Sequence, residues 1–132
     1  MVRRGNTTDI DRLVSQYLAA WNETDSAAQL RHLHATWSEA GVFVDPLVRI
    51  VGRDALHQHI ARCQASYPGS RFVLTGKIAH HHDQIHFSWA LLDAQARELV
   101  AGRDFVELDE LGRIHRLVAF FSAPARPGQD QR

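Results

Sequence analysis

The apolar residues of this chain change their spacing near residue 71, from a helical repeat to an alternating one. Upstream they recur every three or four residues, as on one face of a helix. The clearest such stripe is formed by Ile10, Leu13, Val14, Tyr17, Leu18 and Trp21. Downstream, apolar and polar residues alternate as they do along half-buried strands. Helices followed by hairpin-connected strands predict an α+β fold, with the helices packed on one face of a curved, mostly antiparallel sheet.

The upstream part predicts three helices. They run from Thr8 to a turn at 22–25, from that turn to about Trp37, and from Gly52 to about Tyr67. The proline and glycine that follow Tyr67 are the usual signals for the end of a helix.

A short buried strand, Gly41-Val42-Phe43-Val44, is predicted between the second and third helices, and it ends at Asp45-Pro46. Branched and aromatic residues favour strands. A proline has no N–H to donate, so the ladder stops there. An acid at this position either initiates an Asp-Pro turn or points into a cavity. A second extended piece is expected at 48–51.

The downstream part predicts a meander of four strands. Short polar segments separate them, as hairpin turns would. The strands are expected at 71–79, 85–94, 98–108 and 113–122. One domain, residues 1–122, holds the helices and the sheet. Residues 123–132 contain two prolines and no aliphatic run, which indicates a disordered tail.

Charge and composition argue against several classes of function. Basic and acidic side chains are equal in number, 15 each, and no basic run occurs, so we expect neither nucleic acid nor a membrane as a partner. The N-terminus does not resemble a signal peptide. The single cysteine, Cys63, cannot form an internal disulfide and is typical of a reducing compartment. A cytoplasmic protein is therefore expected.

The last predicted strand is apolar on both faces, which points to a partner. Strict alternation places Ile114, Val118 and Phe120 on one face, and Leu117, Ala119 and Phe121 on the other. A sheet that is apolar on both faces usually has both of them covered. A homodimer across the open face is the simplest cover.

Five short segments support a family resemblance. They are Tyr17-Leu18-Ala19-Ala20-Trp21-Asn22, Val44-Asp45-Pro46, Gly52-Arg53-Asp54-Ala55-Leu56, Phe87-Ser88-Trp89 and Gly102-Arg103-Asp104-Phe105. With this order of elements the chain resembles the nuclear transport factor 2-like superfamily, and within it the SnoaL-like and ketosteroid isomerase-like proteins. The resemblance covers residues 8–121. It implies a cone-shaped fold, in which a curved sheet wraps round a long helix and encloses an apolar pocket, usually in a homodimer.

The resemblance to ketosteroid isomerases implies three catalytic residues. In those enzymes a tyrosine on the first helix and a protonated aspartate on a late strand donate hydrogen bonds to the substrate oxyanion, and an aspartate before a proline moves the proton. Tyr17, Asp104 and Asp45 occupy the matching positions. Asp45 would then be the base, and Tyr17 and Asp104 the oxyanion donors. The implied substrate is a small hydrophobic carbonyl compound, and no cofactor is expected.

Strand alternation supports this interpretation independently. Gly102, Asp104 and Val106 share one face, whereas the nearest cation, Arg103, points to the other. Burial without a cation raises the pKa of a carboxyl group, so Asp104 is expected to be neutral and able to donate a hydrogen bond. Two acids in different protonation states beside a phenol suit proton abstraction next to a carbonyl.

Further side chains are candidates for substrate binding. Phe43 and Trp89 are expected to form pocket walls, and His86 to line the pocket as an acid or base. His34 and His59 are weaker candidates of the same kind, since a lone histidine beside an apolar stripe is more often a core group. Cys63 is assigned to inert packing. The histidines at 80–82 and 86 lie close in sequence, but neighbouring residues in a turn rarely converge on one ion, so no metal site is predicted.

Two other functions remain open, because this fold carries many activities. One is a non-catalytic module that binds a ligand or a protein, in which Tyr17 and Asp104 hydrogen-bond each other as a core pair. The other is a dehydratase or cyclase that acts on a polyketide-like substrate.

Overall fold

The structure, a computed structural model, describes residues 7–122. The tail predicted at 123–132 lies outside the described residues. The helices are α1 (Thr7–Asn22), α2 (Ser26–Thr36) and α3 (Arg53–Ser66). The strands are β1 (Trp37–Val44), β2 (Arg49–Val51), β3 (Arg71–Leu74), β4 (Ala79–His81), β5 (Gln84–Leu92), β6 (Glu98–Leu108) and β7 (Ile114–Ser122).

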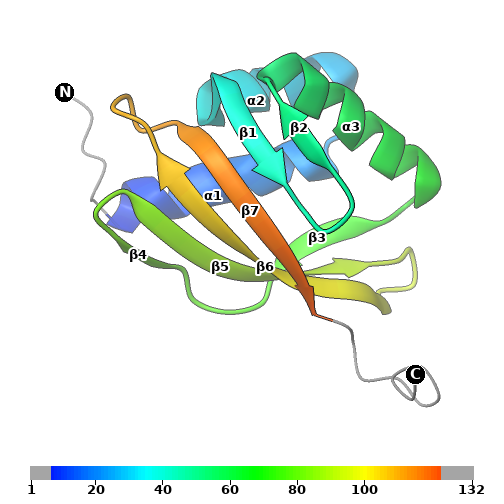
Figure 1. Ribbon diagram of the computed structural model, residues 1–132. Helices are drawn as coiled ribbons and strands as arrows, with labels where there is room; N and C mark the ends of the chain where they lie inside the picture. The colour runs from blue at the N-terminus through cyan, green and yellow to red at the C-terminus, as the bar shows by residue number, and fades with distance from the viewer. Residues whose placement is uncertain (1–6, 123–132) are drawn as a thin grey trace.

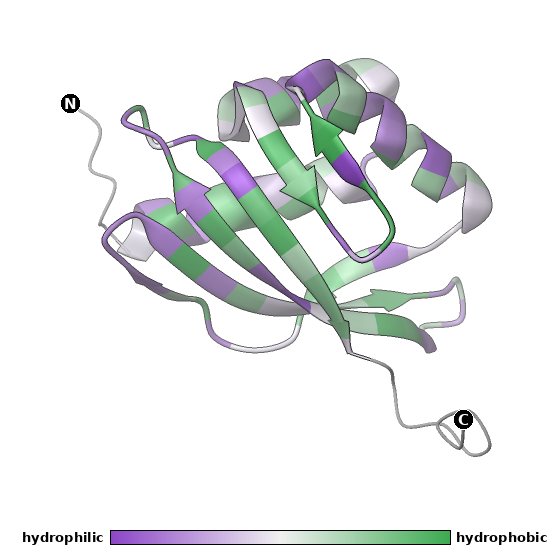
Figure 2. Cartoon of the chain, viewed as in Figure 1, coloured by the Kyte–Doolittle hydropathy of each residue, from purple (hydrophilic) through white to green (hydrophobic). Residues whose placement is uncertain are grey.

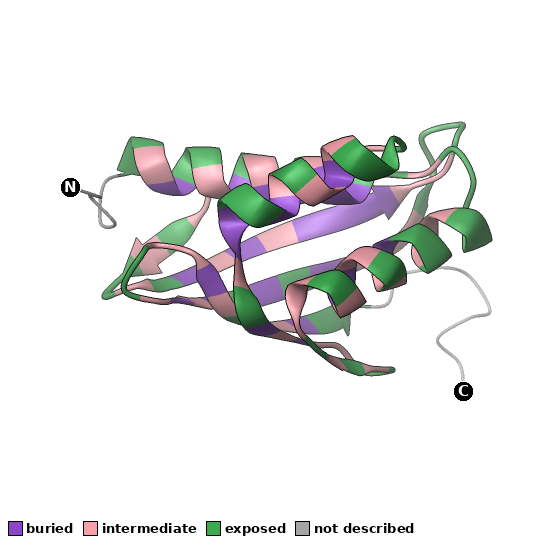
Figure 3. Ribbon diagram, turned by 90° about the horizontal axis from the view of Figure 1, so that it is seen from above, coloured by how far each residue is buried: buried purple, intermediate pink, exposed green. Residues whose placement is uncertain are grey.

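The strands form one curved, open sheet in the order β2-β1-β7-β6-β5-β3, and β4 also pairs with β5 (Figure 1). The β1–β7 pair is parallel and the other pairs are antiparallel. The three helices lie over one side of this sheet, above the buried residues of the strands (Figure 3). The predicted α+β cone, with N-terminal helices packed in a mostly antiparallel sheet, is confirmed.

The predicted stripe of α1 faces the sheet and forms the centre of the core. Its buried residues are Ile10, Val14, Tyr17, Leu18, Ala20 and Trp21. The second helix begins as expected from the turn, where the Asp25 carboxylate accepts a 2.9 Å hydrogen bond from the Ala28 N–H. It ends one residue earlier than predicted. Trp37 has extended backbone angles and begins β1 instead.

The prediction of one strand at 71–79 is wrong, because the chain forms two short strands there. Leu74 lies opposite Trp89, and Ala79 lies opposite His86. Four residues, 75–78, therefore bridge a span that takes only two residues on β5, and the ladder breaks around Gly76. The following turn is also tighter than predicted, since only His82 and Asp83 separate β4 from β5 and both have positive φ, as in a two-residue hairpin.

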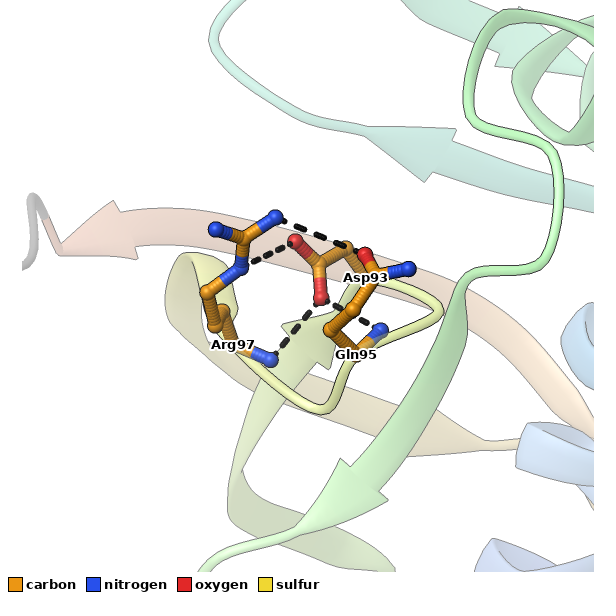
Figure 4. A network of polar contacts seen from close by, with 3 residues as sticks. All are labelled: Asp93, Gln95 and Arg97. Atoms are coloured by element: carbon orange, nitrogen blue, oxygen red, sulfur yellow. Dashed lines mark hydrogen bonds and ion pairs between the residues drawn. The ribbon is translucent and has the colours of Figure 1, made fainter.

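The two later hairpins share one device, an aspartate that closes the turn. Asp93 Oδ1 accepts hydrogen bonds from the Gln95 and Arg97 N–H groups, both at 2.9 Å, and Arg97 Nε donates to Asp93 Oδ2 at 3.1 Å (Figure 4). Asp109 Oδ1 accepts in the same way from Leu111 and Arg113. These local bonds fix the register in which β5, β6 and β7 pair.

Buried and less buried side chains alternate along the first part of β5, from Gln84 to Trp89, where the strand is banded in Figure 2, but β7 departs from alternation. Arg116 lies opposite Glu107 and Ile114 lies opposite Leu108, so the register shifts at His115. The predicted face of Ile114 is therefore wrong. The bulge turns Ile114 into the core beside Leu117, because an extra residue in one strand reverses the alternation beyond it.

No helix within residues 7–122 combines the length and apolar character needed to cross a membrane.

Candidate functional site

A cavity of about 550 Å³ lies between the sheet and the helices. Most of its wall is apolar and aromatic, and a few polar side chains reach it from four different elements. Its lining includes Tyr17 and Trp21 from α1, Phe43 and Asp45 from β1 and the following turn, His59, Cys63, Gln64 and Tyr67 from α3 and its end, Phe72 from β3, Trp89 from β5, Asp104 from β6, and Ala119 and Phe121 from β7. Pockets of this composition are typical of small-molecule sites.

Asp104 is the most deeply buried acid of the described chain, with only 4% of its surface exposed. Trp89 Nε1 donates a 2.9 Å hydrogen bond to Asp104 Oδ1. Burial raises the pKa of the Asp104 carboxyl to about 7, the Trp89 bond opposes that rise, and the negative charge of Asp45 adds to it. Arg103 is exposed on the other face of β6. At neutral pH a large share of Asp104 is therefore a neutral acid.

Gly102 makes the bond between Trp89 and Asp104 sterically allowed. It lies opposite Trp89 across the β5–β6 ladder. A Cβ atom at Gly102 would lie 2.3 Å from Cζ2 of Trp89 and 2.7 Å from the Phe120 carbonyl oxygen. The missing side chain thus leaves the space in which the indole lies across β6.

Tyr17 brings a buried phenol to the same cavity. Its ring stacks on Trp37 with centroids 5.7 Å apart, and the residue is only 2% exposed. Burial raises the pKa of Tyr17 well above its ordinary value, and the charge of Asp104 raises it further. The Tyr17 phenol therefore keeps its proton and can donate a hydrogen bond. Within residues 7–122, the side chain that donates a hydrogen bond to the Asp104 carboxyl is Trp89, not Tyr17.

Asp45 both initiates a turn and lines the cavity, so the turn and the cavity interpretations of Asp45-Pro46 both apply. Its Oδ1 accepts hydrogen bonds from the N–H groups of Leu47 and Val48, at 2.8 and 2.9 Å. It is partly exposed, and its negative charge raises the pKa values of Tyr17, Cys63 and Asp104. Asp45 is thus the negative charge at the edge of an apolar cavity.

The α3 side of the cavity holds His59, which the sequence indicated as a weaker candidate for the pocket, and Cys63, which was assigned to inert packing. His59 Nε2 lies 3.5 Å from Cys63 Sγ. The His59 ring lies 5.7 Å from Phe43 and 5.9 Å, edge to face, from Trp21. The buried residues of α3 are Leu56 and Ile60, both in its first half, so this helix leaves the sheet toward its C-terminal end and its side chains become cavity walls.

A pair of amide side chains, the buried Gln29 and the half-buried Gln64, ties α3 to the other helices. Gln64 Nε2 donates to the carbonyl oxygens of Trp21 and Glu23, at 2.8 and 2.7 Å. Gln29, only 2% exposed, donates to Gln64 Oε1 at 2.8 Å. These bonds satisfy carbonyls at the C-terminal end of α1 and hold the His59 turn of α3 over the cavity.

The structure brings five of the six predicted site residues to one cavity, namely Tyr17, Phe43, Asp45, Trp89 and Asp104. The prediction that His86 lines the pocket is wrong. Along β5 the His86 side chain points to the face opposite that of Phe87 and Trp89. It therefore lies on the outer face of the sheet, where its ring stacks on Phe105 with centroids 4.6 Å apart. His34, the other weak candidate, is exposed.

The histidines at 80–82 and 86 do not converge on one metal site. His81 Nδ1 and His82 Nδ1 lie 3.2 Å apart. Within residues 7–122, no group of three or more His, Cys, Asp or Glu side chains is placed to hold a metal ion.

Comparison with known proteins places this geometry in a family. No family model matches the sequence, and no curated protein matches it. Solved structures do. A SnoaL-like family protein from Agrobacterium tumefaciens str. C58, for which an isomerase activity is proposed, is 33% identical, with a TM-score of 0.81 over 85% of this chain and 96% of that chain.

More distant structures share the fold alone. A cystatin-like-fold protein of unknown function from Methylobium petroleophilum PM1 is 18% identical, with a TM-score of 0.73 over 96% of this chain and 84% of that one. A proposed polyketide cyclase from Sinorhizobium meliloti is 16% identical, with a TM-score of 0.64 over 86% of this chain and 98% of that one. Together with the confirmed cone fold, the 33% identical relative shows that this chain belongs to the SnoaL-like family.

Proposed function

We propose that the cavity binds a small hydrophobic carbonyl compound and catalyses proton transfer next to its carbonyl group, as an isomerase does. The observation that carries this proposal is the pairing of a buried phenol, Tyr17, with a buried acid, Asp104, on the wall of one apolar cavity. Both can donate hydrogen bonds to an oxygen that becomes negative in the transition state. Asp45 supplies a negative charge that favours removal of the proton from the substrate.

The relative from Agrobacterium supports this choice, since an isomerase activity is proposed for it. The proposed cyclase from Sinorhizobium shares only the fold. In a non-catalytic binding module, Tyr17 and Asp104 would act as structural groups, and an oxyanion would gain nothing from them.

A fluorescent naphthol tests the oxyanion site, because its anion resembles the enolate in charge and shape. We expect the wild-type protein to bind it, and Tyr17→Phe to weaken binding about 10- to 100-fold, since a hydrogen bond to a charged oxygen contributes roughly 1.5–3 kcal/mol. Titration followed by fluorescence at pH 6 measures this.

Tyr67 gives a matched control, since it lines the same cavity but is 51% exposed. Tyr67→Phe should leave naphthol binding within a factor of about two, because an exposed hydroxyl exchanges its hydrogen bond with water. Equal binding by wild type and Tyr17→Phe would favour the non-catalytic module.

We also propose that the outer face of the sheet forms a homodimer interface. Phe105 and Phe120 are 44% and 56% exposed there, with their rings 5.7 Å apart, edge to face. Val118, the β-ladder partner of Phe105, continues this apolar surface. Exposed aromatic clusters of this kind usually mark contact surfaces.

Phe120→Arg should therefore convert a dimer into a monomer in sedimentation velocity, because it places a charge in the interface. Leu111→Arg is the control. Leu111 is 63% exposed, but it lies in the turn before β7. A wild-type monomer, or a Phe120→Arg dimer of undiminished affinity, would contradict the proposed interface.

A further inference from the structure

His59 occupies a position from which it can carry a proton. It lines the cavity together with Tyr17 and Asp104, and its ring packs against the rings of both Trp21 and Phe43. It lies on α3, an element that contributes none of the three predicted catalytic residues.

The charged and titratable groups that face His59 come from every side of the cavity. Asp45 approaches from the turn after β1, and Arg62 and Cys63 belong to α3 itself. Tyr17 of α1 and Asp104 of β6 line the same cavity. Of these groups, Asp45 is the one that stabilises a positive charge on the His59 ring.

We propose that His59 is the immediate proton acceptor in this cavity, and that Asp45 acts by stabilising the imidazolium that forms. This inference rests on the proposed proton transfer and names the residue that performs it. It changes the role of Asp45 from base to charge partner, in keeping with the two backbone N–H groups that already occupy its Oδ1.

The protonation states of the neighbours leave His59 available. Burial lowers the pKa of His59, although Asp45 opposes that effect, so the ring is neutral at pH 7. Burial also raises the pKa of the Cys63 thiol. A neutral thiol and a neutral imidazole do not form an ion pair, and the ring keeps its basic nitrogen. An imidazole is also the stronger base, with a reference pKa about 2.5 units above that of an aspartate carboxyl.

The step balances without any co-reactant. A C–H bond next to the substrate carbonyl breaks, and its proton moves to a ring nitrogen of His59. The electron pair of that bond forms the carbon–carbon double bond of the enolate, and the π pair of the carbonyl moves onto its oxygen, which is then bound by Tyr17 and neutral Asp104. Returning the proton from the imidazolium to carbon regenerates the neutral ring and the ketone.

The test uses 2-tetralone, a hydrophobic ketone with acidic C–H groups, and follows its hydrogen–deuterium exchange in D₂O by NMR. His59→Gln should slow exchange by about 10²–10⁴-fold, the usual contribution of a general base. The matched control is His57→Gln, two residues earlier on α3, whose Nε2 contacts Ser26 outside the cavity. It should exchange like the wild type, and thermal unfolding checks that both variants fold.

The pH profile gives a second signature. The acidic limb should have its midpoint below 6.5, where His59 protonates, and Asp45→Asn should move that midpoint lower, because Asp45 raises the pKa of His59. Unchanged exchange in His59→Gln, or an acidic midpoint near 4, as expected for a carboxylate base, would overturn the role of His59. The proposed function would then stand if Tyr17→Phe still slowed the reaction. No acceleration by the wild type would overturn both.

Discussion

Asp104→Asn should abolish a loss of stability that the wild-type protein shows as the pH rises from about 4 to about 8. Asp104 is almost fully buried, and burial raises its pKa from 3.8 to about 7. Between these two values the folded protein holds a proton that the unfolded chain has released. The free energy of unfolding therefore falls with rising pH in this window, and above it the protein carries a buried carboxylate at constant cost.

The expected decline in the free energy of unfolding is large for a single side chain. Each unit of pKa difference corresponds to about 1.4 kcal/mol, so the decline amounts to roughly 4 kcal/mol. Asparagine has the same shape and keeps a carbonyl oxygen that can accept the Trp89 N–H, but it carries no charge. The stability of the variant relative to the wild type should rise by this amount across the window, as urea unfolding at a series of pH values would measure.

Asp93→Asn is the control, because its pKa is shifted the other way. The backbone N–H of Arg97 lowers the pKa of Asp93, so this group stabilises the fold at higher pH and loses that effect as the pH falls. Its replacement leaves the decline due to Asp104 in place. Parallel stability curves for the wild type and Asp104→Asn would show that Asp104 is not held as a neutral acid.

The parts of the fold that were predictable are those set by local periodicity. The α1 stripe, the alternation that buries Asp104 and exposes Arg103, and the aspartate-closed turns are each decided within a few residues of one another. The family resemblance supplied the cone shape with its enclosed pocket and the assignment of Tyr17 and Asp104 to one site. Neither could come from spacing alone.

Two of the errors, the single strand at 71–79 and the face of Ile114, have one physical origin, the extra residues in the ladder. Whether residues 75–78 continue a strand depends on how far β5 extends opposite them, and the shift at His115 depends on the register with β6. Such insertions are settled by the partner strand, which a single strand's pattern does not contain. Ile114 was assigned to the wrong face for this reason.

The sequence indicated the α3 side of the site only weakly, with His59 as a secondary candidate and Cys63 assigned to packing, for a related reason. A helical stripe shows which residues face inward, but not how far the helix stands from the sheet. The position of α3 is set by the Gln29–Gln64 bonds to α1 carbonyls, between residues far apart in sequence. Because α3 packs against the core only near its start, His59 and Cys63 border a cavity instead of filling the core.

Gly102→Ala should destabilise the protein by roughly 2–4 kcal/mol, adding the cost of an overpacked core to the loss of a buried hydrogen bond. The new methyl group would overlap Trp89 and approach the Phe120 carbonyl. The carbonyl belongs to the backbone of the next strand and cannot move alone, so the indole must shift. Since the indole N–H is the hydrogen-bond donor to Asp104, the strain reaches the candidate site directly.

The displaced indole gives this variant a signature that simple destabilisation lacks. The Trp89 bond lowers the pKa of Asp104, so its loss should raise the pH at which Asp104 ionises, as a carboxyl NMR titration would measure. Gly76→Ala is the matched control, because a Cβ there meets nothing within 4 Å and stability should hardly change. If Gly102→Ala were as stable as the control and left the Asp104 titration unmoved, the close contact between β6 and Trp89 would not be what holds the indole against the acid.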